Sequence, residues 1–176
     1  VHLRSLPSLR KVNLDRRGPD ESRCAITDEG VRYLKELTSL EHLDLHGNLS
    51  DEAVAQLGEL TNLRHLRVAG GSMDPRGDAA LEGLAGLHNL EELFISGTGI
   101  TDAGMAFIAR LERLRRLTLH FIDPITDAGL TRLAGLKSLE ELDVPSRITS
   151  SDLSTLNTLS HLKSIERIRL VRDEQD

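Results

Sequence analysis

The sequence predicts an α/β protein built from one repeated unit, in which a short helix and a short strand alternate. Leucine supplies 33 of the 176 residues and aromatic residues only 2%, so one branched side chain fills most of the core. An apolar pattern recurs along nearly the whole chain at intervals of roughly 24 residues. Within each copy the apolar spacing changes from three residues to two, which is typical of a helix followed by a strand.

The repeat is clearest when residues 26–45 are aligned with residues 100–119, because their apolar positions coincide throughout. The same frame recurs, with looser starts in two copies, over residues 49–68, 76–95, 125–144 and 148–170. The last apolar positions of the predicted strands mark about seven copies: Leu14, Leu45, Val68, Ile95, Leu119, Val144 and Leu170.

The first half of each unit predicts a helix. Val31, Leu34 and Leu37 lie three residues apart, which places them on one helical face. A hydroxyl residue followed by aspartate opens most copies, as in Thr27-Asp28. The hydroxyl can accept a hydrogen bond from a free backbone N–H, and the carboxylate is favourable at the positive end of a helix. The same opening occurs at Ser50-Asp51, Thr101-Asp102, Thr126-Asp127 and Ser151-Asp152.

The second half ends in Leu-x-Leu, as in Leu43-Asp44-Leu45, which is the alternation of a strand with one buried face. With this spacing and the Ile-Thr-Asp-Ala-Gly-Leu opening at residues 125–130, the chain resembles leucine-rich repeat proteins, in particular the helix-containing repeats of bacterial and F-box-associated members. The resemblance implies a curved right-handed leucine-rich-repeat solenoid with a concave parallel sheet, convex helices and a protein partner. The asparagine that usually follows the strand is present only at Asn48, so other groups must satisfy the turn backbone.

The domain prediction is a single leucine-rich-repeat domain over residues 1–176. Neither end carries an obvious polar capping segment, which indicates a fragment of a longer chain; self-association through the uncapped ends is the alternative. Two insertions, residues 15–25 and 69–78, contain Gly-Pro or Asp-Pro and are expected as loops on one rim, where the strands end.

In a parallel, in-register sheet the residues beside the strand leucines form three columns on the concave face. The first column reads Lys11, His42, His65, Glu92, Arg116, Glu141 and Arg167; the middle column reads Asn13, Asp44, Arg67, Phe94, Thr118, Asp143 and Arg169; the third reads Asp15, His46, Ala69, Ser96, His120, Pro145 and Val171. Opposite charges lie side by side at Asp44 and Arg67, Glu92 and Arg116, Glu141 and Arg167, and Asp143 and Arg169, so the face is largely self-neutralising.

Phe94 is the exception, because an aromatic side chain in the middle column is predicted to be exposed. An exposed aromatic beside arginine and histidine has the composition of an interface hot spot. The candidate partner-binding residues are Asp44, Arg67, Phe94, Arg116, His120 and Phe121, the last of which could instead turn inward. Tyr33 and Phe107 are expected to pack between neighbouring helices.

Other chemistry is disfavoured. A net charge of −6 and a self-neutralising face argue against nucleic-acid binding, and no apolar run is long enough to span a bilayer. His42, Asp44 and His65 could approach one metal ion, but solvated histidines are the favoured interpretation. The sequence thus predicts no catalytic residue, no cofactor and no metal. Cys24 is the single cysteine, which weakly favours a cytoplasmic location.

The leading functional prediction is a non-enzymatic module that binds a protein partner through its concave sheet and one loop rim. Two alternatives stay open. One is a sensor or substrate-recruiting domain of a larger enzyme or signalling protein, of the ligase or immune type. The other is a self-associating structural segment.

Overall fold

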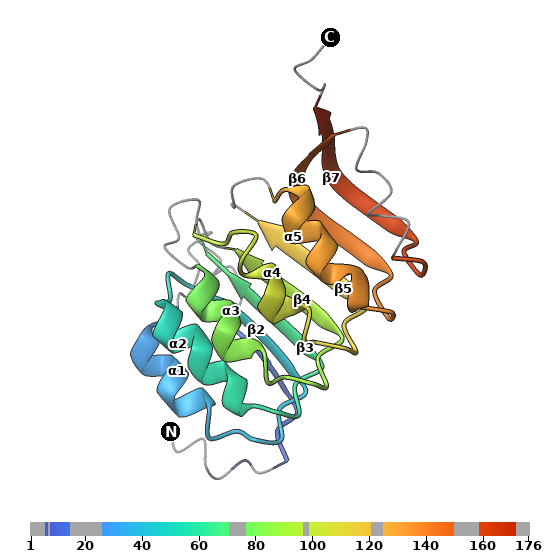
Figure 1. Ribbon diagram of the computed structural model, residues 1–176. Coiled ribbons are helices and arrows are strands. Elements are labelled where there is room, and N and C mark those ends of the chain that lie inside the picture. The colour runs from blue at the N-terminus through green and yellow to red at the C-terminus, as the bar shows by residue number, and fades with distance from the viewer. Residues whose placement is uncertain are drawn as a thin grey trace, which may run out of the picture.

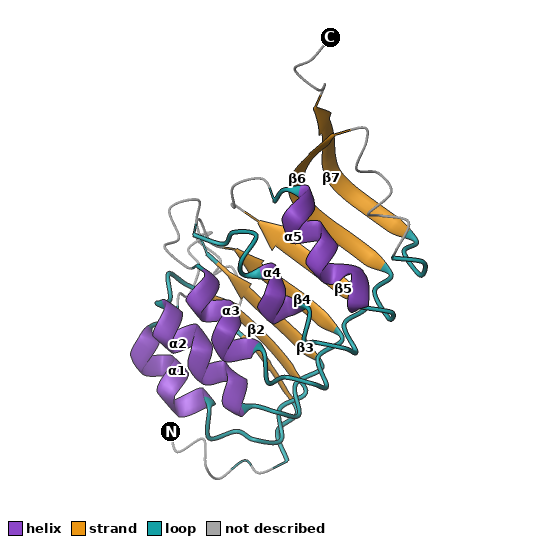
Figure 2. Ribbon diagram, in the orientation of Figure 1, coloured by secondary structure: helices purple, strands orange, loops and turns teal. Residues whose placement is uncertain are grey.

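The computed structural model describes residues 6, 8–14, 26–70, 77–96, 99–120, 125–149 and 159–171. Seven parallel strands form one sheet whose spatial order follows the chain order, with helices along one face (Figures 1 and 2). This confirms the predicted α/β solenoid. The strands are Lys11–Asn13 (β1), His42–His46 (β2), His65–Ala69 (β3), Glu92–Ser96 (β4), Arg116–His120 (β5), Glu141–Thr149 (β6) and Ser164–Val171 (β7).

Three of the predicted hydroxyl-aspartate openings, at Thr27, Ser50 and Thr126, lead directly into a helix. The helix Asp78–Leu84 instead follows Gly77 and has no side-chain cap, and the opening at Ser151-Asp152 lies outside the described residues. The side chains of Thr27, Ser50 and Thr126 accept hydrogen bonds from backbone N–H groups of the following turn. Thr101 accepts in the same way from the N–H of Ala103, although the helix there begins only at Met105. The helices are Asp28–Leu34 (α1), Asp51–Gln56 (α2), Asp78–Leu84 (α3), Met105–Ile108 (α4) and Asp127–Arg132 (α5), with 3₁₀ turns at Leu57–Glu59 (η2) and Leu133–Gly135 (η3).

The core is one continuous layer of leucine between the sheet and the helices. In the repeat that contains α1 and β2, the helical positions and both strand leucines are at most 4% exposed. Phe107 packs against this layer as predicted, because α4 has helix neighbours on both sides. Tyr33 does not: it is 57% exposed on α1, which packs against α2 on one side.

An aspartate ladder joins the helix openings of successive repeats. Each aspartate accepts a hydrogen bond from the backbone N–H of a residue in the next repeat, at 2.9 to 3.0 Å. The acceptor–donor pairs are Asp28 and Ser50, Asp51 and Gly77, Asp78 and Thr101, and Asp102 and Thr126. The sequence predicted only a favourable position at the helix end for these carboxylates. The Ser96 hydroxyl also accepts a hydrogen bond, at 2.8 Å, from the N–H of Gly70. Together with the aspartate ladder it satisfies backbone N–H groups in the turns, a role that an asparagine ladder would otherwise fill.

The last two contacts of the ladder explain the Thr-Asp-Ala-Gly opening. Thr101 and Thr126 each donate a second hydrogen bond, from the hydroxyl to the other oxygen of the same carboxylate. A Cβ atom at Gly104 would lie 2.2 Å from Oδ1 of Asp78, and one at Gly129 would lie 2.4 Å from Oδ1 of Asp102. Glycine is therefore required at both positions, because any larger residue would occupy the space of the aspartate side chain from the preceding repeat.

The register of the last strand differs from the prediction. Glu141 and Asp143 face Ser164 and Glu166, whereas the sequence alignment placed Arg167 and Arg169 there. Leu159, Leu162 and Ile165 have the same three-residue spacing as Leu136, Leu139 and Leu142 in the preceding repeat, and this spacing sets the start of β7. Residues 168–170, Ile-Arg-Leu, also have the apolar alternation of a strand, so the sequence alignment placed the strand there. A register shift between Asp143 and Ser146 follows.

Candidate functional site

The concave columns form as predicted over the first six strands. Backbone pairing aligns Lys11, His42, His65, Glu92, Arg116 and Glu141 in the first column, and Asn13, Asp44, Arg67, Phe94, Thr118 and Asp143 in the middle column. The third column differs. Ala69 is 5% and Ser96 1% exposed, so this column does not present a continuous row of side chains to solvent.

Phe94 is half-buried on the concave face rather than fully exposed, because two neighbours cover part of its ring. The guanidinium carbon of Arg67 lies 3.6 Å from the ring centroid, within the range of a cation–π contact. The ring of His120 lies on the other side, with 4.9 Å between centroids and planes tilted by 48°. Three of the predicted contact residues therefore form one cluster, held in place by aromatic contacts.

Arg116 lies in a row of charges in the first column. Its guanidinium contacts Glu92 at 2.6 Å on one side and Glu141 at 2.9 Å on the other. The hydrogen bond to Glu141 and the negative charge of Glu92 raise the pKa of Arg116. The predicted pairing of Glu92 with Arg116 is confirmed, whereas the predicted partner of Glu141, Arg167, is wrong because of the register of β7.

Two histidines lie at the other end of the first column. The rings of His42 and His65 stack, with centroids 4.1 Å apart and planes 11° from parallel, and Nδ1 of His65 lies 2.9 Å from Glu92. Burial, followed by the nearby His65 and Lys11, lowers the pKa of His42. Among the described residues no group of three or more histidine, cysteine, aspartate or glutamate side chains could hold a metal ion.

A hollow of about 220 Å³ opens on this face. We call it the concave hollow. Four of the predicted contact residues line it: Asp44, Arg67, Phe94 and Arg116. The leucines of β3 and β4 form its floor. Asp44 is held by Asn13, whose Nδ2 donates to it at 2.7 Å. The concave hollow thus combines an aromatic face, an aliphatic floor and charges of both signs.

His120, the fifth predicted contact, lies outside the lining but touches Phe94. Its Nε2 is 3.8 Å from Asp143. The sixth, Phe121, lies outside the described residues, as do residues 15–25 and 71–76, which hold most of the two predicted rim loops, with Cys24 among them. The proposed contribution of that rim to binding stays a prediction.

The column immediately before the strands was missed by the sequence analysis. It alternates strictly in sign and we call it the ion ladder: Arg10, Glu41, Arg64, Glu91, Arg115, Glu140 and Lys163. Ion pairs join Arg10 with Glu41, Arg64 with Glu91 at 2.6 Å, Arg115 with Glu140 at 2.9 Å, and Lys163 with Glu140 at 3.0 Å. Reading the aligned repeats one position earlier would have found it.

The family model described as leucine-rich repeat region matches residues 21–175. The chain therefore belongs to the leucine-rich repeat family, which is generally a non-enzymatic fold for protein interaction. None of the curated proteins matches the sequence. No helix in the described part of the chain has the length and apolar character needed to cross a membrane.

Solved structures share the fold at low identity. The ectodomain of the Arabidopsis thaliana receptor kinase GASSHO1/SCHENGEN3, in complex with CASPARIAN STRIP INTEGRITY FACTOR 2, is 15% identical with a TM-score of 0.59, covering 97% of this chain and 19% of that one. Internalin C2 from Listeria monocytogenes is 22% identical with a TM-score of 0.59, covering 88% and 73%. The Arabidopsis HAESA ectodomain, in complex with an IDA peptide hormone ligand, is 22% identical with a TM-score of 0.57, covering 78% and 23%. This chain thus spans about a fifth of the two plant ectodomains.

Proposed function

We propose that this chain is a non-enzymatic recognition module that binds a protein partner through its concave face, centred on the concave hollow. The observation that carries the proposal is Phe94, a half-buried aromatic at the centre of a mixed apolar and charged hollow. Hot spots at protein interfaces are enriched in aromatic residues and arginine. Here both types lie side by side on strands of a rigid sheet, so little side-chain freedom is lost on binding.

The structural relatives support a protein ligand in general. Two of the three were solved as complexes, one with a protein factor and one with a peptide hormone. At such low sequence identity these structures support the fold of this chain but do not identify its ligand. The choice of contact residues therefore rests on this chain's own geometry: Arg67 and His120 hold the ring of Phe94, and the two carboxylates that flank Arg116 orient its guanidinium.

The test is a comparative affinity capture from lysate of the source organism, with identification of the retained proteins. The Phe94→Ala, Arg116→Ala variant should lose a partner that the wild-type chain retains. A matched control, Tyr33→Ala with Arg132→Ala, removes an exposed aromatic and an arginine from α1 and α5 on the opposite face. With the partner in hand, Phe94→Ala should weaken binding by about 2 kcal/mol in calorimetry. Equal retention by wild type and by both double variants would move the site away from the concave hollow.

A second candidate, self-association, is favoured by apolar exposure at both ends of the sheet. Leu6 is 44% exposed and Leu14 38%, next to β1, while Ile165 on β7 is 39% exposed. Under this proposal Leu14→Asp or Ile165→Asp would lower the weight-average mass in sedimentation equilibrium at high protein concentration. A wild-type mass that stays monomeric across the concentration range would reject it.

A cytoplasmic location is proposed on the single cysteine alone. Fractionation of the source cells, with an antibody against this chain, would test it.

A further inference from the structure

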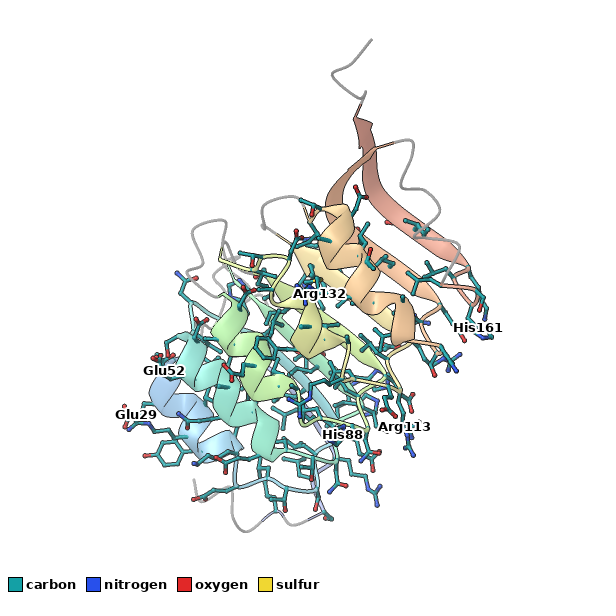
Figure 3. The ribbon with its side chains drawn as sticks, viewed as in Figure 1. Glu29, Glu52, His88, Arg113, Arg132 and His161 are labelled. Carbon is teal, nitrogen blue, oxygen red and sulfur yellow. The ribbon has the colours of Figure 1, made fainter. Side chains whose placement is uncertain are left out.

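A second depression, lined by polar residues, lies along the rim where the strands begin. Two hollows of about 350 and 420 Å³ share Arg64, Glu91 and Arg113 in their linings, so they adjoin. We call them together the rim groove. Its floor is the ion ladder from Glu41 to Glu140, and its outer wall is formed by the turns between helices and strands. Figure 3 shows Arg113 and His161 at this edge of the molecule.

The carboxylates of the rim groove are already engaged. Glu41, Glu91 and Glu140 each form an ion pair with a base of the ion ladder. Two bases, Lys163 and Arg115, hold Glu140, and their hydrogen bonds lower its pKa. The ion ladder is therefore close to neutral within itself.

Three exposed groups of the lining lie outside this pairing: Arg113, Lys137 and His161. Among the described residues none of the three forms an ion pair with a carboxylate. The guanidinium of Arg113 donates to Oδ1 of Asn89 at 2.9 Å, a neutral acceptor that orients the group without cancelling its charge. The three residues come from the turns that precede β5, β6 and β7, so they form a row across adjacent repeats in which Arg113 and Lys137 carry positive charge.

We propose that the rim groove binds an acidic peptide segment in extended conformation, with Arg113 and Lys137 as its main charge contacts. Neighbouring strands are about 4.8 Å apart and alternate residues of an extended peptide about 7 Å apart, a mismatch of roughly 2 Å per repeat. The long side chains of Arg113 and Lys137 can span it, so carboxylates on one side of such a peptide can reach successive turns. Backbone N–H groups of the peptide can donate to Glu91 and Glu140. An acidic peptide therefore offers carboxylates to the basic side chains of the lining and N–H donors to its carboxylates.

Nucleic acid matches the rim groove less well. A phosphate backbone offers acceptors only and would meet three carboxylates along the floor. Within the described part of the chain, the lining has no phenylalanine, tyrosine or tryptophan on which bases could stack. The rim groove is also separate from the concave hollow, so this proposal does not depend on the proposed function.

The test measures binding of a fluorescein-labelled octaglutamate peptide to the full chain by fluorescence anisotropy. Arg113→Gln with Lys137→Gln should weaken binding about tenfold, because two charge-assisted contacts are lost. Arg32→Gln with Arg132→Gln removes the same charge from the convex helices and should change the affinity less than twofold. Equal melting temperatures of the two variants would exclude unfolding as the cause.

Three results would overturn the proposal. They are equal weakening by both double variants, equal or tighter binding of octalysine, and tighter binding of a single-stranded oligonucleotide than of octaglutamate at the same ionic strength. The concave variant Phe94→Ala serves as an internal reference: octaglutamate should bind it as it binds wild type.

Discussion

Two ladders cross the repeats of this protein, and they use charge in different ways. The aspartate ladder ties a side chain of one repeat to the backbone of the next, at the openings of the helices. The ion ladder ties side chain to side chain at the beginnings of the strands. The aspartate ladder satisfies backbone donors, two of which, at Ser50 and Gly77, are part-buried. The ion ladder joins side chains that water could solvate equally well.

A regular charge pattern in the sequence is therefore a poor guide to how much a ladder contributes to the free energy of unfolding. The ion ladder alternates in sign over seven repeats, yet exposed ion pairs contribute between zero and about 1 kcal/mol each. The aspartate ladder is less regular in sequence, with serine, glycine and threonine as its donors. Its hydrogen bonds are charge-assisted, and losing one leaves a backbone donor without its partner. We therefore expect the aspartate ladder to contribute more to stability.

The largest effect is expected for Asp102→Ala. It removes the acceptor of both the N–H and the hydroxyl of Thr126 and should lower the free energy of unfolding by about 2 kcal/mol. Urea denaturation measures this as a shift in midpoint. Asp102→Asn keeps one acceptor oxygen and should lose about half as much. Wild-type stability in both variants would show that the ladder is only a consequence of the fold.

The second-largest effect is expected for Gly104→Ala, which should lower the free energy of unfolding by about 1.5 kcal/mol. Its Cβ would lie 2.2 Å from Oδ1 of Asp78 and would push that carboxylate away from Thr101. Gly135→Ala is the control, since a Cβ there would meet no atom within 4 Å beyond its own stretch of backbone. The substitution Gly104→Ala should cost less in an Asp78→Ala background, so full additivity in this double-mutant cycle would argue against the proposed clash.

A small effect is expected for the ion ladder. Glu91→Gln breaks the ion pair with Arg64 and should lower the free energy of unfolding by less than about 0.5 kcal/mol, because the Arg64 side chain is 51% exposed and water replaces the carboxylate. Added salt should reduce even this difference. A loss as large as that of Asp102→Ala would reverse the proposed ranking of the two ladders.

The smallest effect concerns pH. The pKa of Glu140 is lower in the folded chain than its ordinary value of 4.5, because Lys163 and Arg115 hydrogen-bond to it. A lowered pKa means that the unfolded chain binds more protons, so the contribution to stability is present above pH 4.5 and is lost as the pH falls through the folded pKa. Glu140→Gln should make stability slightly less dependent on pH in this acidic range. Thermal melts across that range would detect the difference, and parallel curves would contradict it.

Much of the fold and part of the site could be predicted from sequence. Period and Leu-x-Leu spacing located the first six strands, and the in-register sheet then placed Asp44, Arg67, Phe94 and Arg116 around one hollow. The last strand was misplaced because residues 168–170 resemble a strand motif, and the alignment followed them instead of Leu159, Leu162 and Ile165, which repeat the spacing of the preceding unit. Tyr33 was misjudged because its homologous position in α4, Phe107, has a helix on each side.

What the sequence determined by itself is the architecture, since a repeated apolar spacing can bury its leucines only by stacking one unit on the next. What only the tertiary structure decided is the use of the polar residues. Whether an aspartate caps its own helix or the backbone of its neighbour, and which cations stay outside the ion ladder, depends on distances across repeats. Residues 22 to 26 positions apart in sequence come into contact there, and their pairing follows from the three-dimensional stacking of the units.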